Sequence, residues 1–438
     1  MFNSLFLGQM NDMNPSPVFA SIITIGDELL IGQTIDTNSA WMAQQLNDNG
    51  IWVKRRVAVG DERAEIWQAL DEAIVSSDII LITGGLGPTA DDITKPLLGD
   101  YFGGKMIVNE EVLEHVKYIF QHILKRPLLE RNLKQAEVPD NCRVLINKNG
   151  TAPGMWFEKK DSSSEAKKII ISLPGVPHEM KGLMKTYIIP ELTTLTNHQV
   201  IIHRTLLTAG AGESFIAEHI QAWENNLPER IKLAYLPNYG MVRLRLTGKG
   251  QQGSDIEKMV DQKFMELQQL VKEWLVIESD EPMEKALGDL LIQKNKTIAT
   301  AESCTGGYLA HLLTSIPGSS AYYKGSVIAY DNKVKEEILQ VRNNTLKEYG
   351  AVSSETVLEM LQGLLAKMGT DYGIAVSGIM GPAGGSEDKP TGTVWIAFGS
   401  AEKQRTISFH FRFDRQRNIQ LTAVHALLNL FKFIQSES

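Results

Sequence analysis

Cysteine is scarce in this chain, and long apolar runs and an excess of basic residues are missing altogether. The only cysteines among its 438 residues are Cys142 and Cys304, far apart in the sequence. Two such cysteines exclude a disulfide framework or a cysteine-rich metal site, and they suit a reducing compartment. Because no apolar run reaches membrane-spanning length, we expect a cytoplasmic protein without a membrane partner.

The charge balance is acidic. Lysine and arginine number 44 against 52 aspartates and glutamates, which gives a formal net charge of −8. General nucleic-acid binders are usually basic, so nucleic acid is not expected as a partner. Small anionic ligands stay open, because backbone loops can bind them locally. Residues 1–17 lack the basic start and long apolar centre of a signal peptide, and we expect a disordered leader there.

The remaining sequence predicts a multi-domain α/β protein. An apolar fraction of 43% is ordinary for a globular chain, and this length corresponds to two or three domains. Residues 18–190 alternate between strands, expected at 19–25, 51–59 and 79–83, and helices, expected at 39–49 and 63–76. This βαβαβ rhythm predicts a parallel sheet covered on both faces, which is a three-layer α/β domain.

Two further regions follow. Residues 191–278 predict a small α+β module, with helices at 213–224 and 255–274. Residues 279–438 mix helices and strands again and predict a second α/β domain. Its last strand is expected at 406–413, where every second residue from Ile407 to Phe413 is apolar and should lie on one buried face.

Residues 300–309 carry the strongest chemical signal and read T-A-E-S-C-T-G-G-Y-L. They follow an apolar strand and precede a helix, so backbone N–H groups and the positive helix end should line a pocket. A nucleophile there can attack a carbonyl while N–H groups stabilise the oxyanion. Ser303 is the candidate nucleophile, and the turn of Thr305, Gly306 and Gly307 is the candidate donor set for oxyanion and substrate.

Cys304 is an alternative nucleophile, because a thiol is intrinsically more reactive than a hydroxyl. Adjacent residues at a strand end point in different directions, so only one of the two can face the pocket. A buried, inert cysteine is the commoner case, which favours Ser303.

A general base for this serine is expected in residues 330–339, Y-D-N-K-V-K-E-E-I-L. A helix beginning after Asp331 or Asn332 places Lys335 on the same face as two apolar residues, and Lys333 on the same face as two glutamates. Lys335 is therefore the lysine expected to be buried, and burial lowers a lysine pKa as a general base requires.

Ser303 with Lys335 thus forms a candidate Ser–Lys pair for acyl transfer. Tyr330 is the candidate to position substrate or relay a proton. A glycine-rich segment, residues 377–393, reads S-G-I-M-G-P-A-G-G-S-E-D-K-P-T-G-T and can hold a phosphate. A flexible surface turn is an equally good interpretation of it. Its candidate substrate-binding residues are Ser377, Gly378, Gly381 and Gly385.

Four stretches of the last domain resemble the nicotinamide-nucleotide amidase (PncC-type) family: A-E-S-C-T-G-G, Y-D-N-K-V-K, G-A-V-S and the glycine-rich segment extended to Trp395. The resemblance implies hydrolysis of NMN to nicotinate mononucleotide and ammonia without a metal. The family's nucleophilic serine, lysine and tyrosine fall on Ser303, Lys335 and Tyr330. A substrate-binding arginine falls on Arg415, after which N-I-Q replaces the usual basic residues.

The first domain carries a second glycine loop. Residues 80–94 read I-L-I-T-G-G-L-G-P-T-A-D-D-I-T, so Gly84, Gly85 and Gly87 follow a strand and can approach a phosphate. Asp91 and Asp92 come next and are candidate ligands of a divalent cation. Helix capping is as good an interpretation for at least one of them. Asp61 follows another strand and is a further candidate ligand-binding residue at the same sheet edge.

This domain resembles the molybdopterin-binding (MoCF) fold in I-G-D-E-L-L-I-G-Q-T-I-D-T-N-S, T-G-G-L-G-P-T-A-D-D, G-T-A-P-G and P-G-V-P-H-E-M. Followed by a KH-type module without a G-x-x-G loop and by the amidase, it resembles the CinA family. That resemblance implies metal-dependent cleavage of ADP-ribose in the first domain. We expect a homodimer that acts on small nucleotides. Alternatives are a competence-related nucleic-acid-binding or assembly protein and a pterin-handling enzyme.

Overall fold

The computed structural model describes residues 18–89, 92–160, 167–195, 199–238 and 240–437. The leader expected at 1–17 and the candidate ligand Asp91 lie outside these ranges. The described chain forms two compact units, and their boundary passes through the middle module: residues 204–227 and 233–246 group with the C-terminal region, and 228–232 and 247–261 with the N-terminal one. None of the described helices has both the length and the apolar character needed to cross a membrane.

A six-stranded sheet with the order β2-β1-β3-β8-β7-β6 forms the centre of the N-terminal domain. Its strands are β1 (Phe19–Ile25), β2 (Trp52–Val59), β3 (Ile79–Thr83), β6 (Arg143–Leu145), β7 (Gly154–Lys160) and β8 (Lys167–Leu173). Strands β2, β1, β3 and β8 run parallel, as predicted, but β7 pairs antiparallel with β8, and β6 pairs antiparallel with β7. Only six residues join β7 to β8, which is too short for the crossover that a parallel neighbour requires.

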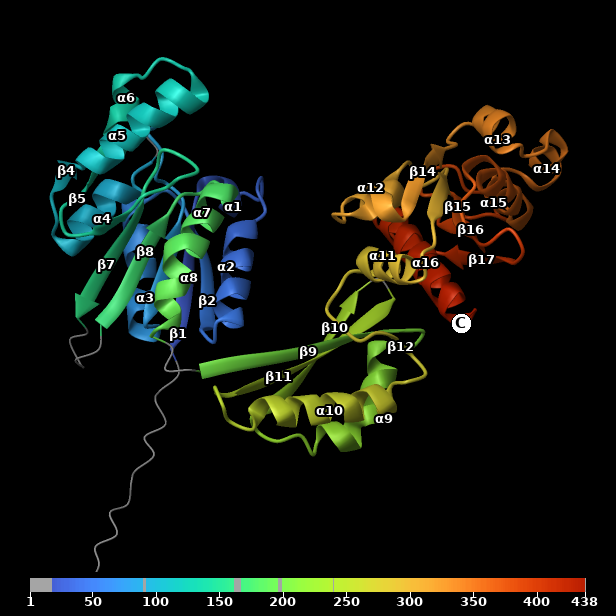
Figure 1. Ribbon diagram of the computed structural model, residues 1–438, viewed down its shortest axis with the longest axis horizontal. Helices are drawn as coiled ribbons and strands as arrows, with labels where there is room; N and C mark the ends of the chain where they lie inside the picture. The colour runs from blue at the N-terminus through green and yellow to red at the C-terminus, as the bar shows by residue number, and fades with distance from the viewer. Residues whose placement is uncertain (1–17, 90–91, 161–166, 196–198, 239, 438) are drawn as a thin grey trace, which may run out of the picture. The chain divides into compact units, whose positions relative to one another are not determined.

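Helices cover both faces of this sheet, so the three-layer prediction is confirmed (Figure 1). Ile79 and Leu81 of β3 pack in one core with α2 (Thr37–Asp48) and α7 (Pro177–Leu183). Ile80 and Ile82 pack in the other core with α3 (Arg63–Ser76) and α4 (Thr94–Phe102). The alternation follows from the two-residue period of a strand.

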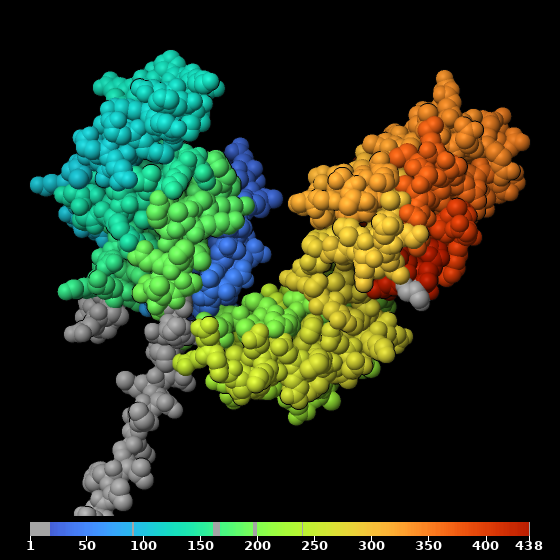
Figure 2. Space-filling model, in the orientation of Figure 1, coloured from blue at the N-terminus to red at the C-terminus, as the bar shows by residue number. Residues whose placement is uncertain are grey.

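Residues 103–142 leave this sheet and form a lobe with its own small core (Figures 1 and 2). A two-stranded antiparallel ribbon pairs β4 with β5. The lobe contains β4 (Met106–Val108), α5 (Glu110–Tyr118), a π-helical turn η1 (Ile119–Leu124), α6 (Glu130–Leu133), η2 (Lys134–Ala136) and β5 (Glu137–Pro139).

The middle module contains a four-stranded sheet in the order β10-β11-β9-β12. Its helix α9 (Glu213–Glu224) has the predicted bounds, and α10 (Ile256–Leu270) ends four residues earlier than predicted. The strands are β9 (Gln199–Ala209), β10 (Ile231–Asn238), β11 (Met241–Gln251) and β12 (Leu275–Ile277).

The C-terminal domain has a five-stranded sheet in the order β14-β13-β15-β16-β17. Strand β13 pairs in parallel with β14 and β15, whereas β16 and β17 are antiparallel additions. The strands are β13 (Ile298–Glu302), β14 (Tyr323–Ile328), β15 (Tyr372–Gly378), β16 (Thr393–Gly399) and β17 (Gln404–His410). Strand β17 ends three residues before the predicted bound, and Phe413, expected to be buried, is 52% exposed because it directly precedes the helix cap Asp414.

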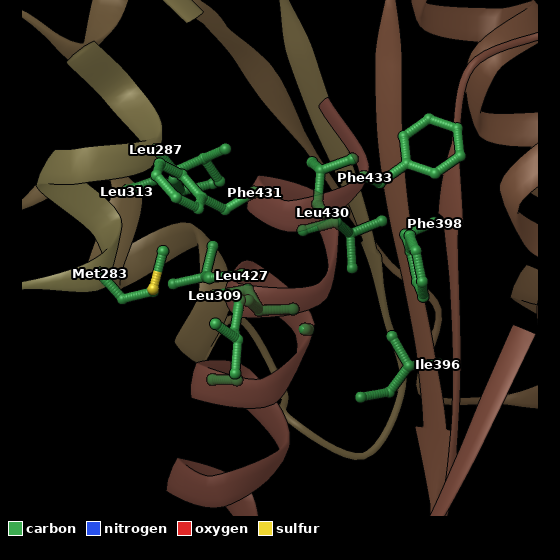
Figure 3. Packing of buried hydrophobic residues seen from close by; sticks show 14 of the residues in the cluster. Met283, Leu287, Leu309, Leu313, Ile396, Phe398, Leu427, Leu430, Phe431 and Phe433 are labelled. Atoms are coloured by element: carbon green, nitrogen blue, oxygen red, sulfur yellow. The ribbon is translucent and has the colours of Figure 1, made fainter. Parts of the chain in front are cut away.

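Two helical layers enclose this sheet. On one face α11 (Met283–Gln293), α12 (Tyr308–Thr314) and α16 (Arg415–Ser436) share a core with β16, where Leu287 and Leu313 lie beside Phe431 (Figure 3). On the other face lie α13 (Asn332–Leu339) and α15 (Ser354–Met368). Open α/β sheets bind their ligands outside the carboxyl ends of the parallel strands. The carboxyl end of β13 is therefore where a site is expected.

Candidate functional site

Ser303 lies directly after β13, the strand between β14 and β15. Its N–H donates to the carbonyl of Val376 at 3.0 Å, which ties the residue to the end of β15. Ser303 is 8% exposed, and its hydroxyl has no hydrogen-bond partner among the described residues. The structure thus holds the main chain of Ser303 firmly and leaves its oxygen available for a reaction.

The glycine turn after Ser303 is closed on itself. Gly306 and Gly307 have φ angles of 60° and 101°, which other residues adopt only with strain. The Gly306 N–H donates to the Ser303 carbonyl at 3.2 Å, and the Gly307 N–H donates to the Glu302 carboxylate at 3.0 Å. Both N–H groups are therefore occupied, and the expectation that they bind an oxyanion is wrong.

Two other N–H groups are available as donors to an oxyanion. Within the described ranges, the N–H groups of Cys304 and Thr305 have no hydrogen-bond acceptor outside their own residues. They directly follow the serine, the position from which backbone donors stabilise an oxyanion formed at that serine. The candidate donor set shifts by one or two residues toward Ser303, and Thr305 stays in it.

Glu302, which the sequence analysis did not single out, organises the turn after Ser303. It is fully buried, and its carboxylate accepts hydrogen bonds from the Thr305 hydroxyl at 2.7 Å and from the N–H groups of Leu309 and Ala310 at 3.0 and 2.8 Å. The positive end of α12 is thus satisfied by the protein's own carboxylate rather than left open for a ligand. The only sequence signal was an acidic residue at the end of an otherwise apolar strand.

Lys335 is 1% exposed, whereas the side chain of Lys333 is 77% exposed, so the predicted choice of buried lysine is confirmed. Asp331 caps the helix, as one of the two predicted alternatives, by accepting from the Lys333 N–H at 2.7 Å. The Lys335 ammonium donates to the carbonyl of Ala329 at 2.9 Å and to that of Tyr330 at 3.2 Å.

Burial lowers the pKa of Lys335, and the charge of Asp331 opposes that shift only in part. Ala329, whose carbonyl accepts from the amine, donates its N–H to the Glu302 carbonyl at 2.8 Å, so the amine lies near the same end of β13 as Ser303. No hydrogen bond joins the amine directly to the Ser303 hydroxyl in the described structure. A pair of this kind often tightens only when substrate binds.

The alternative nucleophile Cys304 is buried, and desolvation raises the pKa of its thiol to about 12. The thiol therefore stays protonated near neutral pH, and protonated thiols are poor nucleophiles. This favours Ser303, in agreement with the preference drawn from the sequence.

Three of the predicted site residues meet at one point. The Arg415 guanidinium donates to the Tyr330 hydroxyl at 3.2 Å and to the Gly381 carbonyl at 2.9 Å. Tyr330 is 62% exposed, so its ring is accessible to a ligand. Asn418, which stands among the residues that depart from the family pattern, is fully buried and donates to the carbonyls of Met380 and Phe413. It ties the glycine loop to the start of α16.

Other candidates in the glycine-rich segment serve the fold. The buried Ser377 hydroxyl donates to the Ala351 carbonyl at 2.6 Å. A side chain at Gly378 would lie 2.8 Å from Val394, and one at Gly385 would lie 2.6 Å from the backbone of Thr391. These three positions are packed against protein, which argues against direct contact between their own atoms and a ligand.

A second site lies in the N-terminal domain, where a cavity of about 300 Å³ opens at the carboxyl ends of β1 and β3. Four predicted residues line it: Asp61, Gly84, Gly85 and Asp92. Gly87 does not line it, but a side chain there would collide with the Asp92 carboxylate. The position agrees with the preference of ligands for this edge of open α/β sheets.

The carboxylates of this cavity fit a hard divalent cation only in part. Asp92 accepts hydrogen bonds from the Thr89 N–H at 3.0 Å and from its hydroxyl, and it does not cap α4, so the capping alternative fails for this residue. Asp61 accepts from the Asp27 N–H at 3.1 Å. In the described ranges no three His, Cys, Asp or Glu side chains come together as metal ligands. A cation there would need oxygens of the substrate and of water as well, as Mg²⁺ commonly does.

The chain is similar to known protein families along most of its length. Three family descriptions match it: "Probable molybdopterin binding domain" over residues 21–194, "Damage-inducible protein CinA KH domain" over 203–276 and "CinA C-terminal domain" over 280–434.

Whole-chain relatives are also found. A CinA-like protein of Cytophaga hutchinsonii is 46% identical over 415 residues, which are 95% of this chain and 97% of that protein. A CinA-like protein of Flavobacterium psychrophilum is 42% identical over 95% of this chain and 98% of its own length. A crystal structure of a CinA superfamily protein from Klebsiella pneumoniae is 33% identical, with a TM-score of 0.34, over 36% of this chain and 99% of that one. The chain therefore belongs to the CinA family.

Proposed function

We propose that the C-terminal domain is an amidase that hydrolyses NMN to nicotinate mononucleotide and ammonia. The observation that carries this proposal is that one end of β13 holds a buried lysine and a serine hydroxyl without a hydrogen-bond partner among the described residues. A serine hydroxyl needs a neighbouring base to act as a nucleophile, and a lysine can supply one only in its neutral form. Burial of Lys335 favours that form, because it penalises the charged amine.

The proposed reaction runs in two halves. Lys335 takes the proton of Ser303 as the serine oxygen bonds to the carboxamide carbon, and the N–H groups of Cys304 and Thr305 stabilise the oxyanion. The ammonium of Lys335 then gives the proton to the leaving nitrogen, and ammonia departs from an acyl-serine ester. Water, deprotonated by the same lysine, attacks the ester carbonyl, and the serine leaves with the proton returned by that lysine.

The 5′-phosphate of NMN needs a cationic partner outside the helix start, because Glu302 already occupies the N-terminal donors of α12. Arg415 supplies it in our proposal, with its guanidinium anchored by Gly381 and Tyr330. A planar guanidinium suits a phosphate, since it can donate two parallel hydrogen bonds.

We further propose that the N-terminal cavity binds ADP-ribose and that its diphosphate is cleaved there with the help of a divalent cation. Gly84 and Gly85 let the backbone approach the diphosphate, and Asp61 and Asp92 offer the carboxylate oxygens. When bound, the cation would offset the diphosphate charge. On this proposal the protein is a cytoplasmic enzyme with two separate hydrolytic sites and small nucleotides as substrates.

The decisive test measures both activities on purified full-length protein. Ser303→Ala should lower ammonia release from NMN at least about 1,000-fold and leave ADP-ribose cleavage unchanged. EDTA should abolish ADP-ribose cleavage and leave ammonia release from NMN unchanged. If Ser303→Ala leaves ammonia release intact, the amidase proposal fails, and if it abolishes both activities, the proposal of separate sites fails.

A further inference from the structure

The carboxylate of Glu302 is surrounded by donors from the eight residues that follow it. One oxygen accepts from the Thr305 hydroxyl and from the N–H groups of Gly307 and Leu309, and the other accepts from the Ala310 N–H. The hydroxyls of Thr300 and Ser326 also donate to this second oxygen, at 3.4 Å each. The buried ammonium of Lys335 donates to backbone carbonyls instead of this carboxylate. Neutral donors thus surround the carboxylate, and the closest of them come from the segment that follows Ser303.

This arrangement fixes the segment that carries Ser303. The Ser303 N–H is bound to Val376, its carbonyl accepts from Gly306, and Glu302 closes the turn by binding Thr305 and Gly307. With those groups occupied, the N–H groups of Cys304 and Thr305 are the ones left to face a reacting carbonyl. We propose that Glu302 is the positioning residue that sets the orientation of the Ser303 hydroxyl and of these two donors, an inference that rests on the amidase function proposed above.

Helix capping alone is a poor explanation for this residue. Helices α13, α15 and α16 of the same domain begin with short caps, Asp331, Ser353 and Asp414, each bonded to one backbone N–H. At α12 a full carboxylate is buried and takes three backbone N–H groups and a hydroxyl. A buried carboxyl group costs far more to desolvate than an exposed one such as Asp331 or Asp414, and such costs concentrate at functional sites.

The test compares Glu302→Gln, Thr305→Val and Thr305→Ser in the full-length protein. Glutamine would direct an NH2 group at N–H donors, so we expect kcat for ammonia release to fall at least about tenfold while KM changes less than about threefold. The kcat of Thr305→Val should fall in the same way, because this change removes the hydroxyl bonded to Glu302. Thr305→Ser keeps a hydroxyl, and its kcat should stay within about threefold of the wild-type value. All rates are taken at least about 15 °C below each variant's melting temperature, so that every variant is folded during the assay.

The rate at which a fluorophosphonate probe labels Ser303 is a second readout, with Ser303→Ala as the blank. It should fall in parallel with kcat in Glu302→Gln and Thr305→Val. Wild-type labelling and wild-type kcat in Glu302→Gln, a loss confined to KM, or equal effects of Thr305→Ser and Thr305→Val would each overturn the inference. If wild type is labelled but releases no ammonia from NMN, the proposed substrate is wrong, and the labelling rates still decide the role of Glu302.

Discussion

Arg415 and Tyr330 are joined by a hydrogen bond of 3.2 Å from the guanidinium to the phenol oxygen, although 85 residues separate them in the sequence. The contact connects the first residue of α16 with the loop before α13. Both residues belong to the proposed NMN site, so the pair gives a direct way to separate phosphate binding from chemistry.

Arg415→Lys should raise the KM for NMN about tenfold and change kcat less than about threefold, because lysine keeps the charge and loses the two-pronged geometry. Tyr330→Phe is the matched control, since it removes the hydrogen bond to Arg415 and leaves the cation in place. Steady-state kinetics measures the effect with NMN and with nicotinamide riboside, which lacks the 5′-phosphate. An Arg415→Lys variant that loses affinity equally for both ligands would contradict the assignment.

Lys335→Met should abolish ammonia release and alter the pH dependence of stability. The pKa of Lys335 is lowered by burial, so between the folded and unfolded pKa values the unfolded chain binds more protons. The contribution of Lys335 to the free energy of unfolding therefore rises with pH from its folded pKa up to its unfolded pKa. The value of kcat/KM should rise as the pH passes the folded pKa, because the neutral amine is the proposed base. Melting temperatures of wild type and Lys335→Met between pH 7 and pH 10 should diverge in favour of wild type as pH increases. Parallel curves would show that the residue does not titrate in this range.

Cys304→Ser should keep ammonia release within about threefold of wild type, because a thiol whose pKa is raised to about 12 by desolvation stays protonated and unreactive. Iodoacetamide should likewise fail to inactivate the native enzyme at pH 7.5. Rapid inactivation that Cys304→Ser prevents would point to the cysteine as nucleophile.

Asp92→Asn should lower ADP-ribose cleavage at least about 100-fold and leave ammonia release unchanged, if the carboxylate holds a cation at the diphosphate. Asp100→Asn is the control in the same domain, because Asp100 lies on the surface in an ion pair with Arg63. Product analysis with and without added Mg²⁺ measures the effect. Equal losses in the two variants would indicate a general effect on the domain.

Asn418→Ala should destabilise the C-terminal domain by about 2 kcal/mol, because it leaves the buried carbonyl of Met380 without its Asn418 donor and removes one donor from that of Phe413. Since Asn418 ties the Gly381 loop to the start of α16, the KM for NMN should rise too. Gln420→Ala, two residues further along the same helix, is the control. Thermal unfolding followed by circular dichroism, with kinetics on the same samples, decides the outcome.

Local patterns in the sequence predicted much of the fold. Strand β1 and helices α3 and α9 have the predicted bounds, and helical spacing identified Lys335 as the buried lysine. Strands β6 and β7 were not predicted, because the three residues of β6 and the polar end of β7 at residues 158–160 give little of the strand pattern. Phe413 was misplaced because the strand pattern continues into a helix cap.

The candidate sites were predicted less completely than the fold. Motifs located Ser303, Tyr330, Arg415 and the Gly84–Gly85 loop, yet they could not show which N–H groups the protein itself uses. Glu302 was missed because its donors come from a turn and a helix whose directions only the folded backbone defines. Asn418 was noted as a departure from a family pattern, whereas in the structure it is a buried link between two loops.

Strand β13 is hydrogen-bonded on both sides, and Ser303 continues its ladder through the bond to Val376. Backbone amides in such an inner strand exchange with solvent only when the whole domain opens. Ser303, the proposed nucleophile, is therefore attached to the part of the domain that unfolds last. The loss of amidase activity on heating should therefore coincide with the cooperative unfolding of the domain. No loss of activity is expected at temperatures at which the domain is still folded.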